Sequence, residues 1–131
     1  MTTLCVLDAS AILALLQAEP GHTAVMTRLE NGGCLVSAVN LSEVLTRLID
    51  RGLSPEDAEA AVDALELDVA VFDDAAARGC SALRTVTRSL GLSIGDRACL
   101  ALAIKSKAVA LTADRAWAKA DCGARIELIR A

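Results

Sequence analysis

The chain has 131 residues, with 13 Lys or Arg, 17 Asp or Glu and a formal net charge of −4, and 54% of its residues are hydrophobic. This length and apolar content suit a single folded domain over residues 1–131 and exclude a disordered chain. The longest apolar runs are far shorter than the ~20 residues of a membrane-spanning helix, so we expect a soluble, cytoplasmic protein without a membrane partner.

Apolar runs and helical periodicity alternate along the chain and predict its elements. In chain order, these are a strand at 3–7, helices at 10–18 and 23–30, a strand at 34–37, helices beginning at 40 and 55, a strand at 69–72, helices at 73–90 and 94–107, a strand at 108–111, a short helix at 114–120 and a strand at 126–129. Strands separated by helices pair in parallel through right-handed crossovers. We therefore predict an α/β fold of three layers, whose mostly parallel sheet of four to five strands has helices on both faces.

The cysteines and the single histidine exclude several kinds of site. Five scattered cysteines contain no C-x-x-C pair, which argues against a disulfide framework or a thiolate zinc site and favours small core residues. His22 has no second histidine beside which to bind a metal or form a Ser-His-Asp triad, so we expect it at the surface.

The net charge conceals an asymmetry between the two parts of the chain. Residues 1–77 hold 3 basic and 13 acidic side chains, a net charge of −10, whereas residues 78–131 hold 10 basic and 4 acidic side chains, a net charge of +6. Eight acids fall within 56–74 without a basic residue, and we interpret them as a solvated helix face and loop. The second part is therefore the one suited to meet an anion.

Four acids stand at the junctions between predicted elements. Asp8 ends the first strand, Asp114 follows the fourth, and Glu43 and Asp96 each begin a helix. The carboxyl ends of parallel strands meet at one edge of a sheet, where sites form, so these four side chains are candidates for one site.

Helix capping is the alternative explanation for each of these acids taken singly. Asn40 with Glu43 and Ser93 with Asp96 have capping-box spacing, and Asp8 is placed to cap the first helix. Thr112 or Asp114 is placed to cap the last short helix. No single acid decides between capping and function.

The segments around the four acids, taken in order, resemble the motifs of PIN-domain nucleases, most closely the VapC-type toxins of bacterial toxin–antitoxin pairs. These segments are 6–10 (VLDAS), 42–43 (SE), 95–103 (GDRACLALA) and 111–117 (LTADRAW). The resemblance spans Leu4 to Ile129 and implies a PIN-like fold.

The resemblance also implies a function and a site. It implies a metal-dependent endoribonuclease that is the toxin of a type II toxin–antitoxin pair, leaves a 5′-phosphate and a 3′-hydroxyl, binds a small cognate antitoxin and forms a homodimer. One or two Mg²⁺ or Mn²⁺ ions would be held by the four acids, with two hydroxyl side chains in support. The implied residues are Asp8, Glu43, Asp96 and Asp114, supported by Ser10 and Thr112.

The chemistry of these residue types agrees with that implication. Carboxylate oxygens are hard ligands suited to Mg²⁺ and Mn²⁺, and the lack of histidine pairs and paired cysteines disfavours zinc, copper and iron. Because no histidine is at hand to act as a base, a metal-activated water is the natural nucleophile for a phosphodiester bond.

Three arginines near these acids are candidate RNA contacts. Arg97 and Arg115 directly follow Asp96 and Asp114, and Arg47 lies one helical turn beyond Glu43; a plain surface arginine is the alternative for each. We expect Trp117 to pack the last short helix. With Phe72 as the only other aromatic residue, no platform for base stacking is available, so recognition would rest on RNA shape and backbone.

Two other functions are alternatives to the nuclease. A phosphoacceptor, receiver-like signalling domain also places acids at strand ends, and a catalytically silent PIN-like module that binds RNA or protein would keep the fold without the activity.

The mean hydropathy of +0.47 is high for a soluble monomer and predicts apolar surface covered by a partner. We expect this surface around the two helices that contain Leu13, Leu16, Leu45 and Leu48.

Overall fold

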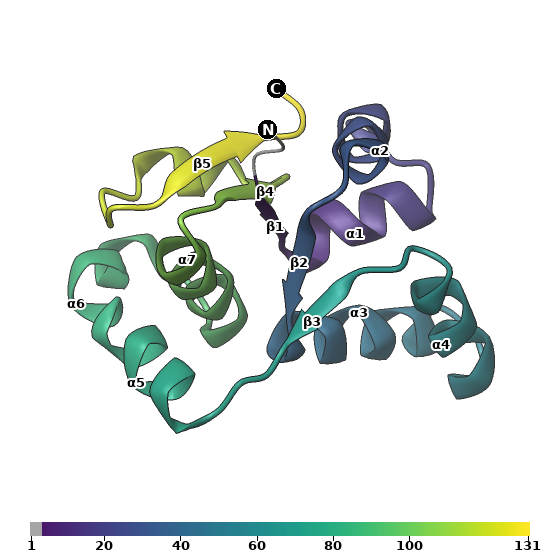
Figure 1. Cartoon of the computed structure of the whole chain (residues 1–131), viewed down its shortest axis with the longest axis horizontal. Coiled ribbons are helices and arrows are strands. Elements are labelled where there is room, and N and C mark those ends of the chain that lie inside the picture. The colour runs from purple at the N-terminus through teal and green to yellow at the C-terminus, as the bar shows by residue number, and fades with distance from the viewer. Residues whose placement is uncertain (1–3) are drawn as a thin grey trace.

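Short runs of Val, Leu, Ala and Cys form a five-stranded sheet in which every neighbouring pair is parallel (Figure 1). The structure is a computed structural model that describes residues 4–131. The strand order β3-β2-β1-β4-β5 places β1 at the centre, and the predicted α/β class is confirmed. The strands are β1 (Cys5–Leu7), β2 (Cys34–Ser37), β3 (Asp68–Ala70), β4 (Val109–Thr112) and β5 (Arg125–Leu128).

Helices cover both faces of this sheet, as predicted. Figure 1 shows α1 to α4 on one side of the sheet and α5 to α7 on the other. The helices are α1 (Ala9–Leu16), α2 (His22–Asn31), α3 (Ala38–Asp50), α4 (Pro55–Asp63), α5 (Asp74–Ala82), α6 (Arg84–Thr87) and α7 (Ile94–Ser106), with the short 3₁₀ helices η1 (Arg88–Leu90) and η2 (Arg115–Lys119). Within residues 4–131, no helix is long and apolar enough to cross a membrane.

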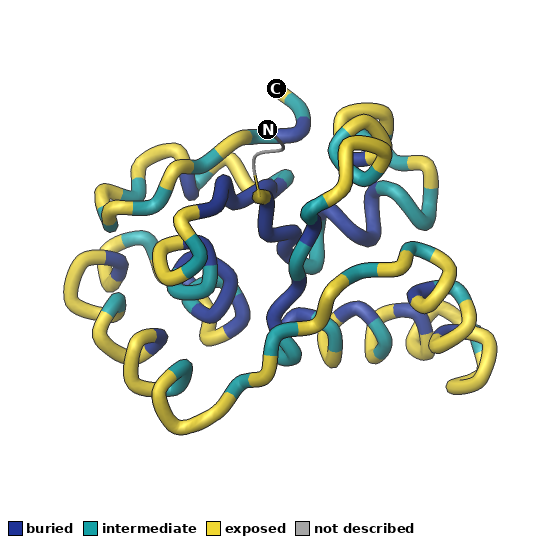
Figure 2. The backbone as a smooth tube through the Cα atoms, in the orientation of Figure 1, coloured by how far each residue is buried: buried dark blue, intermediate teal, exposed yellow. Residues whose placement is uncertain are grey.

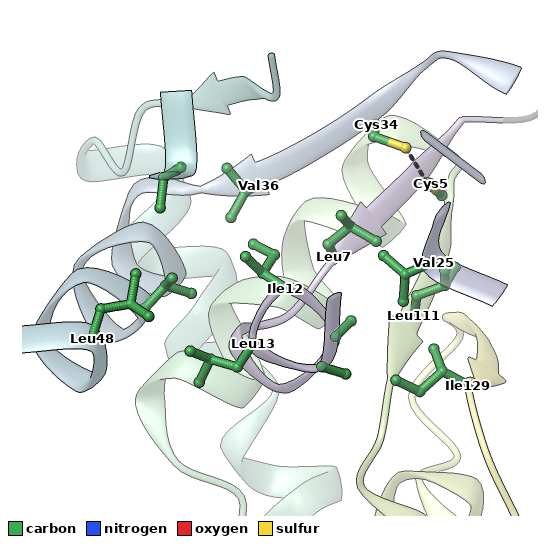
Figure 3. Close-up of a cluster of buried hydrophobic side chains, with 14 of the residues drawn as sticks. Cys5, Leu7, Ile12, Leu13, Val25, Cys34, Val36, Leu48, Leu111 and Ile129 are labelled. Carbon is green, nitrogen blue, oxygen red and sulfur yellow. Dashed lines mark hydrogen bonds between the residues drawn. The ribbon is translucent and has the colours of Figure 1, made fainter. Parts of the chain in front are cut away.

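The central strand supplies alternate residues to two apolar cores. Cys5 and Leu7 pack with α1 to α4 in the core of Figure 3, whereas Val6 packs on the opposite face against α7 and Trp117. All three residues of β1 have no exposed surface, and the strand is dark blue along its length in Figure 2. A strand buried on both faces is a continuous apolar run, which is why β1 was recognisable from sequence.

The predicted helix over 73–90 is wrong as a single element. It is divided into α5, α6 and η1, which ends at Gly91 in a left-handed conformation (φ +64°). Two threonine hydroxyls donate to backbone carbonyls in this region, from Thr85 to Ala82 at 3.0 Å and from Thr87 to Leu83 at 2.8 Å. Such local side-chain bonds compete with regular helical bonding and explain the interruption.

Two other boundaries differ from the prediction for identifiable reasons. Helix α3 begins at Ala38 and not at Asn40, because the Ser37 hydroxyl caps it by accepting from the Val39 amide. Glu43 therefore lies in the second turn of α3 and is not in a capping box. Strand β3 ends at Ala70, because its partner β2 ends opposite, at Ser37, and leaves the predicted strand residues 71–72 unpaired.

The remaining predicted elements are found within two residues of their observed bounds, although the helix over 114–120 is the 3₁₀ helix η2. The predicted first strand began at Thr3, which lies outside the described residues. Ser54 caps α4 with Pro55 in its first turn, as predicted. The eight acids of 56–74 are all exposed, which confirms their interpretation as a solvated surface.

The predicted apolar surface is wrong for two of its four leucines. Leu13 and Leu48 are buried in the core, since their helical faces turn toward the sheet, and Leu16 and Leu45 are half-buried. Large apolar side chains are exposed elsewhere, and Val71 is the most open at 76%. The exposed set in the described part of the chain is Leu4, Met26, Ile49, Val69, Val71, Val86, Ile94 and Ile104.

Candidate active site

Asp8 is held at the carboxyl end of the central strand by two neighbouring elements. Its amide donates to the Leu111 carbonyl of β4 at 3.1 Å. Its Oδ1 caps α1 by accepting from the Ala11 amide at 2.8 Å and also accepts from the Ser10 hydroxyl at 2.7 Å. Its Oδ2 accepts from the Thr112 hydroxyl at 2.6 Å, so both carboxylate oxygens are fixed in a side chain that is only 4% exposed.

The two hydroxyls on Asp8 connect it to the segment after β4. The Ser10 Oγ accepts from the Ala113 amide at 2.9 Å, and the Thr112 Oγ1 accepts from the Asp114 amide at 3.0 Å. Asp114 is exposed, and its Oδ1 accepts from the Ala116 amide at 2.9 Å to cap η2. The predicted capping role of Asp114 is confirmed, and its backbone belongs to the network around Asp8.

Glu43 reaches the same edge of the sheet from α3, through contacts that the sequence did not predict. The Asn40 Nδ2 donates to the Glu43 Oε1 at 2.9 Å and to the Gly95 carbonyl of α7 at 3.0 Å. Asn40 is only 1% exposed, and its Oδ1 is buried without a partner. A Cβ at Gly95 would overlap the Glu43 carboxylate, so the glycine leaves the space that this carboxylate occupies.

Asp96 occupies the first turn of α7, directly after Gly95. The Ser93 amide donates to its Oδ2 at 2.9 Å, and the Asp96 amide donates to the Ser93 hydroxyl at 3.2 Å. The predicted capping box is confirmed. Capping engages one carboxylate oxygen here, so the other is available for a second role.

Three of these carboxylates act electrostatically on the same buried group. Burial raises the pKa of Asp8 to about 6, against the lowering effect of hydrogen bonds from Thr112, Ser10 and the Ala11 amide, and the charge of Asp96 raises it further. The pKa of the Cys99 thiol is well above its usual range, first because it is fully buried and then because of the negative charges of Asp8, Asp96 and Glu43. Cys99 of α7 is therefore within electrostatic range of all three acids.

The donor set fits a hard divalent cation in its chemistry. Four carboxylates supply only oxygen, and the burial that raises the pKa of Asp8 disfavours its charged form, which a bound cation would stabilise. Across residues 4–131, however, no three His, Cys, Asp or Glu side chains are close enough together to hold a metal ion as they stand. Metal binding would therefore require rotation of the more exposed carboxylates, Glu43, Asp96 and Asp114, toward the fixed carboxylate of Asp8.

The sequence model of the PIN domain matches residues 5–122. The chain belongs to the PIN-domain family. The predicted family is thus confirmed, and the match includes all four acids of the candidate site. Comparison with curated protein sequences finds no match.

Solved structures share the fold of this PIN domain at low sequence identity. The DNA-bound VapBC of Salmonella typhimurium is 22% identical with a TM-score of 0.77, covering 97% of this chain and 98% of that one. The sarcin–ricin-loop-cleaving toxin VapC20 of Mycobacterium tuberculosis is 19% identical with a TM-score of 0.74, covering 92% and 98%. VapBC-5 of the same organism is 25% identical with a TM-score of 0.59, covering 98% and 99%.

The three arginines predicted to contact RNA differ in their exposure and in the contacts that they already make within the PIN domain. Arg47 and Arg115 are exposed, on α3 and η2. Arg97 is half-buried, and its Nη1 donates to the Cys80 carbonyl of α5 at 3.3 Å while its Nε is buried without a partner. Arg97 therefore has a structural contact, whereas Arg47 and Arg115 are open to a ligand. Trp117 is fully buried, as predicted.

Asn40 and Gly95 are the parts of the site that the sequence prediction missed. Asn40 was predicted to begin a helix, and Gly95 was only one letter of a motif. A signal did exist, since Asn and Glu three residues apart share one face of a helix. Its meaning depended on α3 packing against α7, which sequence spacing does not reveal.

Proposed function

We propose that this PIN domain is a Mg²⁺- or Mn²⁺-dependent endoribonuclease and the toxin of a type II toxin–antitoxin pair. The observation that carries the proposal is the Asp8 carboxylate, which is buried and oriented on both oxygens at the sheet edge that Glu43 and Asp96 also approach. Membership in the PIN-domain family and the likeness of the fold to VapC-type toxins support the nuclease role.

Asp8, Glu43, Asp96 and Asp114 would hold the cation. A divalent cation in such a site lowers the pKa of water and stabilises the negative charge of the leaving oxygen in phosphodiester hydrolysis. The protein's own contribution is orientation: Ser10 and Thr112 fix Asp8, and Asn40 fixes Glu43.

Arg47 and Arg115 would bind backbone phosphates of the RNA beside these acids. Both are exposed, and each stands close in sequence to a proposed ligand, Glu43 or Asp114. The +6 net charge of residues 78–131 would add a long-range attraction for RNA. The expected products carry a 5′-phosphate and a 3′-hydroxyl.

The proposed partners are a small cognate antitoxin and a second copy of the chain. Solved relatives of the same fold come from VapBC structures, and the exposed apolar side chains of this domain, among them Val71 and Ile94, offer surface that a partner can cover. A cytoplasmic location completes the proposal.

A catalytically silent binding module is the remaining alternative. The receiver-like alternative is overturned by the family match and by the strand order 3-2-1-4-5, which differs from the 2-1-3-4-5 order of flavodoxin-like receivers. The silent module would share every structural feature described above, so activity alone decides.

The deciding experiment measures RNA cleavage by the purified chain with Mg²⁺ or Mn²⁺. We expect Asp8→Asn and Asp96→Asn each to reduce the rate by at least about 100-fold while the circular dichroism spectrum is kept, and EDTA to abolish cleavage. Asp50→Asn is the matched control, since Asp50 is an exposed acid at the far end of α3. Undiminished cleavage by both site variants, or in EDTA, would contradict the proposal, and no cleavage by the wild type would favour the silent module.

A further inference from the structure

Two cysteines meet inside the core, away from the acids. Cys5 of β1 and Cys34 of β2 are direct partners in the parallel register, and their Sγ atoms are 3.0 Å apart (Figure 3). Cys5 has no exposed surface and Cys34 is 6% exposed. The sequence predicts small core residues at both positions, and their burial confirms this, but the register also makes them a pair.

The geometry of this pair is suited to a covalent link. Paired residues on neighbouring strands are separated by about 4.8 Å, which lies within the Cα separations that disulfides span. Both side chains project into the same core, so their Cβ atoms lie on one face of the sheet. Only the sulfurs need to approach, from 3.0 Å to about 2.0 Å, and the backbone can stay in place.

The two thiols are also differentiated chemically. The hydrogen bond between them, with burial, raises the pKa of Cys5 above its usual range. The same hydrogen bond lowers the pKa of Cys34, assisted by the positive charge of Arg28. The two sulfurs therefore share one hydrogen bond, through which the thiol of one cysteine stabilises the thiolate of the other when a proton is lost.

We propose that Cys5 and Cys34 form a dithiol site that a small peroxide oxidises reversibly to an intramolecular disulfide. Because Cys34 is 6% exposed and Cys5 has no exposed surface, we expect a small uncharged oxidant to reach the pair more readily than a bulky disulfide such as glutathione. This site is separate from the proposed nuclease centre, since both cysteines lie three residues before the carboxyl-end residues Asp8 and Ser37.

The reaction balances with hydrogen peroxide as the oxidant. The Cys34 thiolate attacks one peroxide oxygen, the O–O bond breaks, and the departing hydroxide takes up the proton that Cys34 has lost, leaving a sulfenic acid. The Cys5 sulfur then attacks the Cys34 sulfur, and its proton leaves with the sulfenic hydroxyl as water. The two sulfurs lose two electrons in total, and one peroxide becomes two waters.

The sequence makes the link easy to locate, because each cysteine falls in its own tryptic peptide. Cleavage after Arg28 and Arg47 places Cys5 in peptide 1–28 and Cys34 in peptide 29–47. The folded, reduced full chain would be treated with hydrogen peroxide, quenched, alkylated in denaturant and digested. We expect peptides 1–28 and 29–47 to be joined, with the loss of two hydrogen atoms, and to be separated by dithiothreitol.

Two variants and a stability measurement complete the test. Cys34→Ser should abolish the joined peptides, whereas Cys122→Ser should retain them, since Cys122 is half-buried and far from the pair in sequence. Because the link closes a loop of about 30 residues, oxidation should raise the Tm of the wild type by about 10 °C and leave that of Cys34→Ser unchanged.

The proposal would be overturned by separately alkylated peptides 1–28 and 29–47 after oxidation, by a sulfinic or sulfonic acid at Cys34 without a link, or by a link to another cysteine. An unchanged wild-type Tm would overturn it as well, since the linked species would not be the native fold. None of these readouts involves RNA cleavage, so they are independent of the proposed nuclease function.

Discussion

The Thr112 hydroxyl donates a 2.6 Å hydrogen bond to the Asp8 Oδ2 across 104 residues of sequence. The same oxygen of Thr112 accepts from the Asp114 amide, so one side chain joins the ends of β1 and β4 to the last acid of the site. Among the hydrogen bonds that lower the pKa of Asp8, this one has the largest effect. Thr112 therefore governs both the position and the charge of Asp8.

Replacing Thr112 by valine should reduce cleavage at pH 7 by at least about 10-fold, because Asp8 loses an orienting donor and a source of charge stabilisation. Loss of this bond raises the pKa of Asp8 further, so the acid limb of the rate profile should move to higher pH. Thr112→Ser keeps the hydroxyl and should keep both the rate and the profile. A valine variant with the wild-type pH profile would refute this role.

The stability of the metal-free protein should depend on pH through Asp8. Its folded pKa of about 6 lies above the usual aspartate value of 3.8, so the folded state binds more protons between these values. The stability that this group contributes is complete below about pH 4 and is lost as pH rises through 6, and the full loss is about 3 kcal/mol.

Urea unfolding of the wild type and Asp8→Asn in EDTA measures this effect. Other carboxylates affect both proteins alike, so the difference in unfolding free energy isolates Asp8. The asparagine variant should gain about 2 kcal/mol relative to the wild type between pH 4 and pH 7. Mg²⁺ should reduce that gain at pH 7, because it stabilises the charged carboxylate. A difference that does not vary with pH would contradict the prediction.

Gly95→Ala should damage activity while leaving the fold intact. The new methyl group would overlap the Glu43 carboxylate, which ends a flexible side chain and can move away, at the cost of its bond to Asn40. We expect an unfolding free energy within about 1 kcal/mol of the wild type and a loss of cleavage of at least about 10-fold.

Gly79→Ala is the matched control, because a Cβ there would meet only the Ala101 Cβ at 4.0 Å. It should stabilise α5 by about 0.5–1 kcal/mol and leave cleavage unchanged. Full activity in the Gly95 variant would show that the position of Glu43 is not critical.

Arg47→Gln and Arg115→Gln test the contact with RNA. Each should raise KM and reduce the slope of log(kcat/KM) against log salt concentration by about 0.7, as expected when one phosphate contact is lost on a single strand. Arg78→Gln is the control, since Arg78 is exposed but engaged with Asp74 at 2.6 Å. Salt slopes equal to that of the wild type would exclude both arginines from the RNA path.

The parallel strands and the sheet edge of the site were accessible from sequence for a physical reason. Parallel strands buried on both faces must be continuous apolar runs, and β1 and β4 are such runs, each followed closely by an acid, Asp8 or Asp114. The Ser93–Asp96 capping box was readable for a similar reason, since both partners lie within one turn of helix.

The contacts between different helices and strands could not be predicted from the sequence. Asn40 resembles a helix N-cap in sequence, and only the packing of α3 on α7 turns its side chain toward Glu43 and Gly95. The break after Ala82 depends on two threonine hydroxyls that donate hydrogen bonds to backbone carbonyls. The helical spacing of apolar residues does not predict such bonds. The end of β3 is likewise set by its neighbour, Ser37 of β2.

The central place of β1, between β2 and β4, has a consequence during synthesis. Asp8 is synthesised about a hundred residues before the end of β4, the neighbouring strand that supplies the Thr112 hydroxyl. In a nascent chain that does not yet include β4, Asp8 lacks the hydrogen bond from the Thr112 hydroxyl. If the domain is a ribonuclease, its activity arises only after β4 has been made and has paired with β1, so a nascent chain that lacks β4 does not yet cleave RNA.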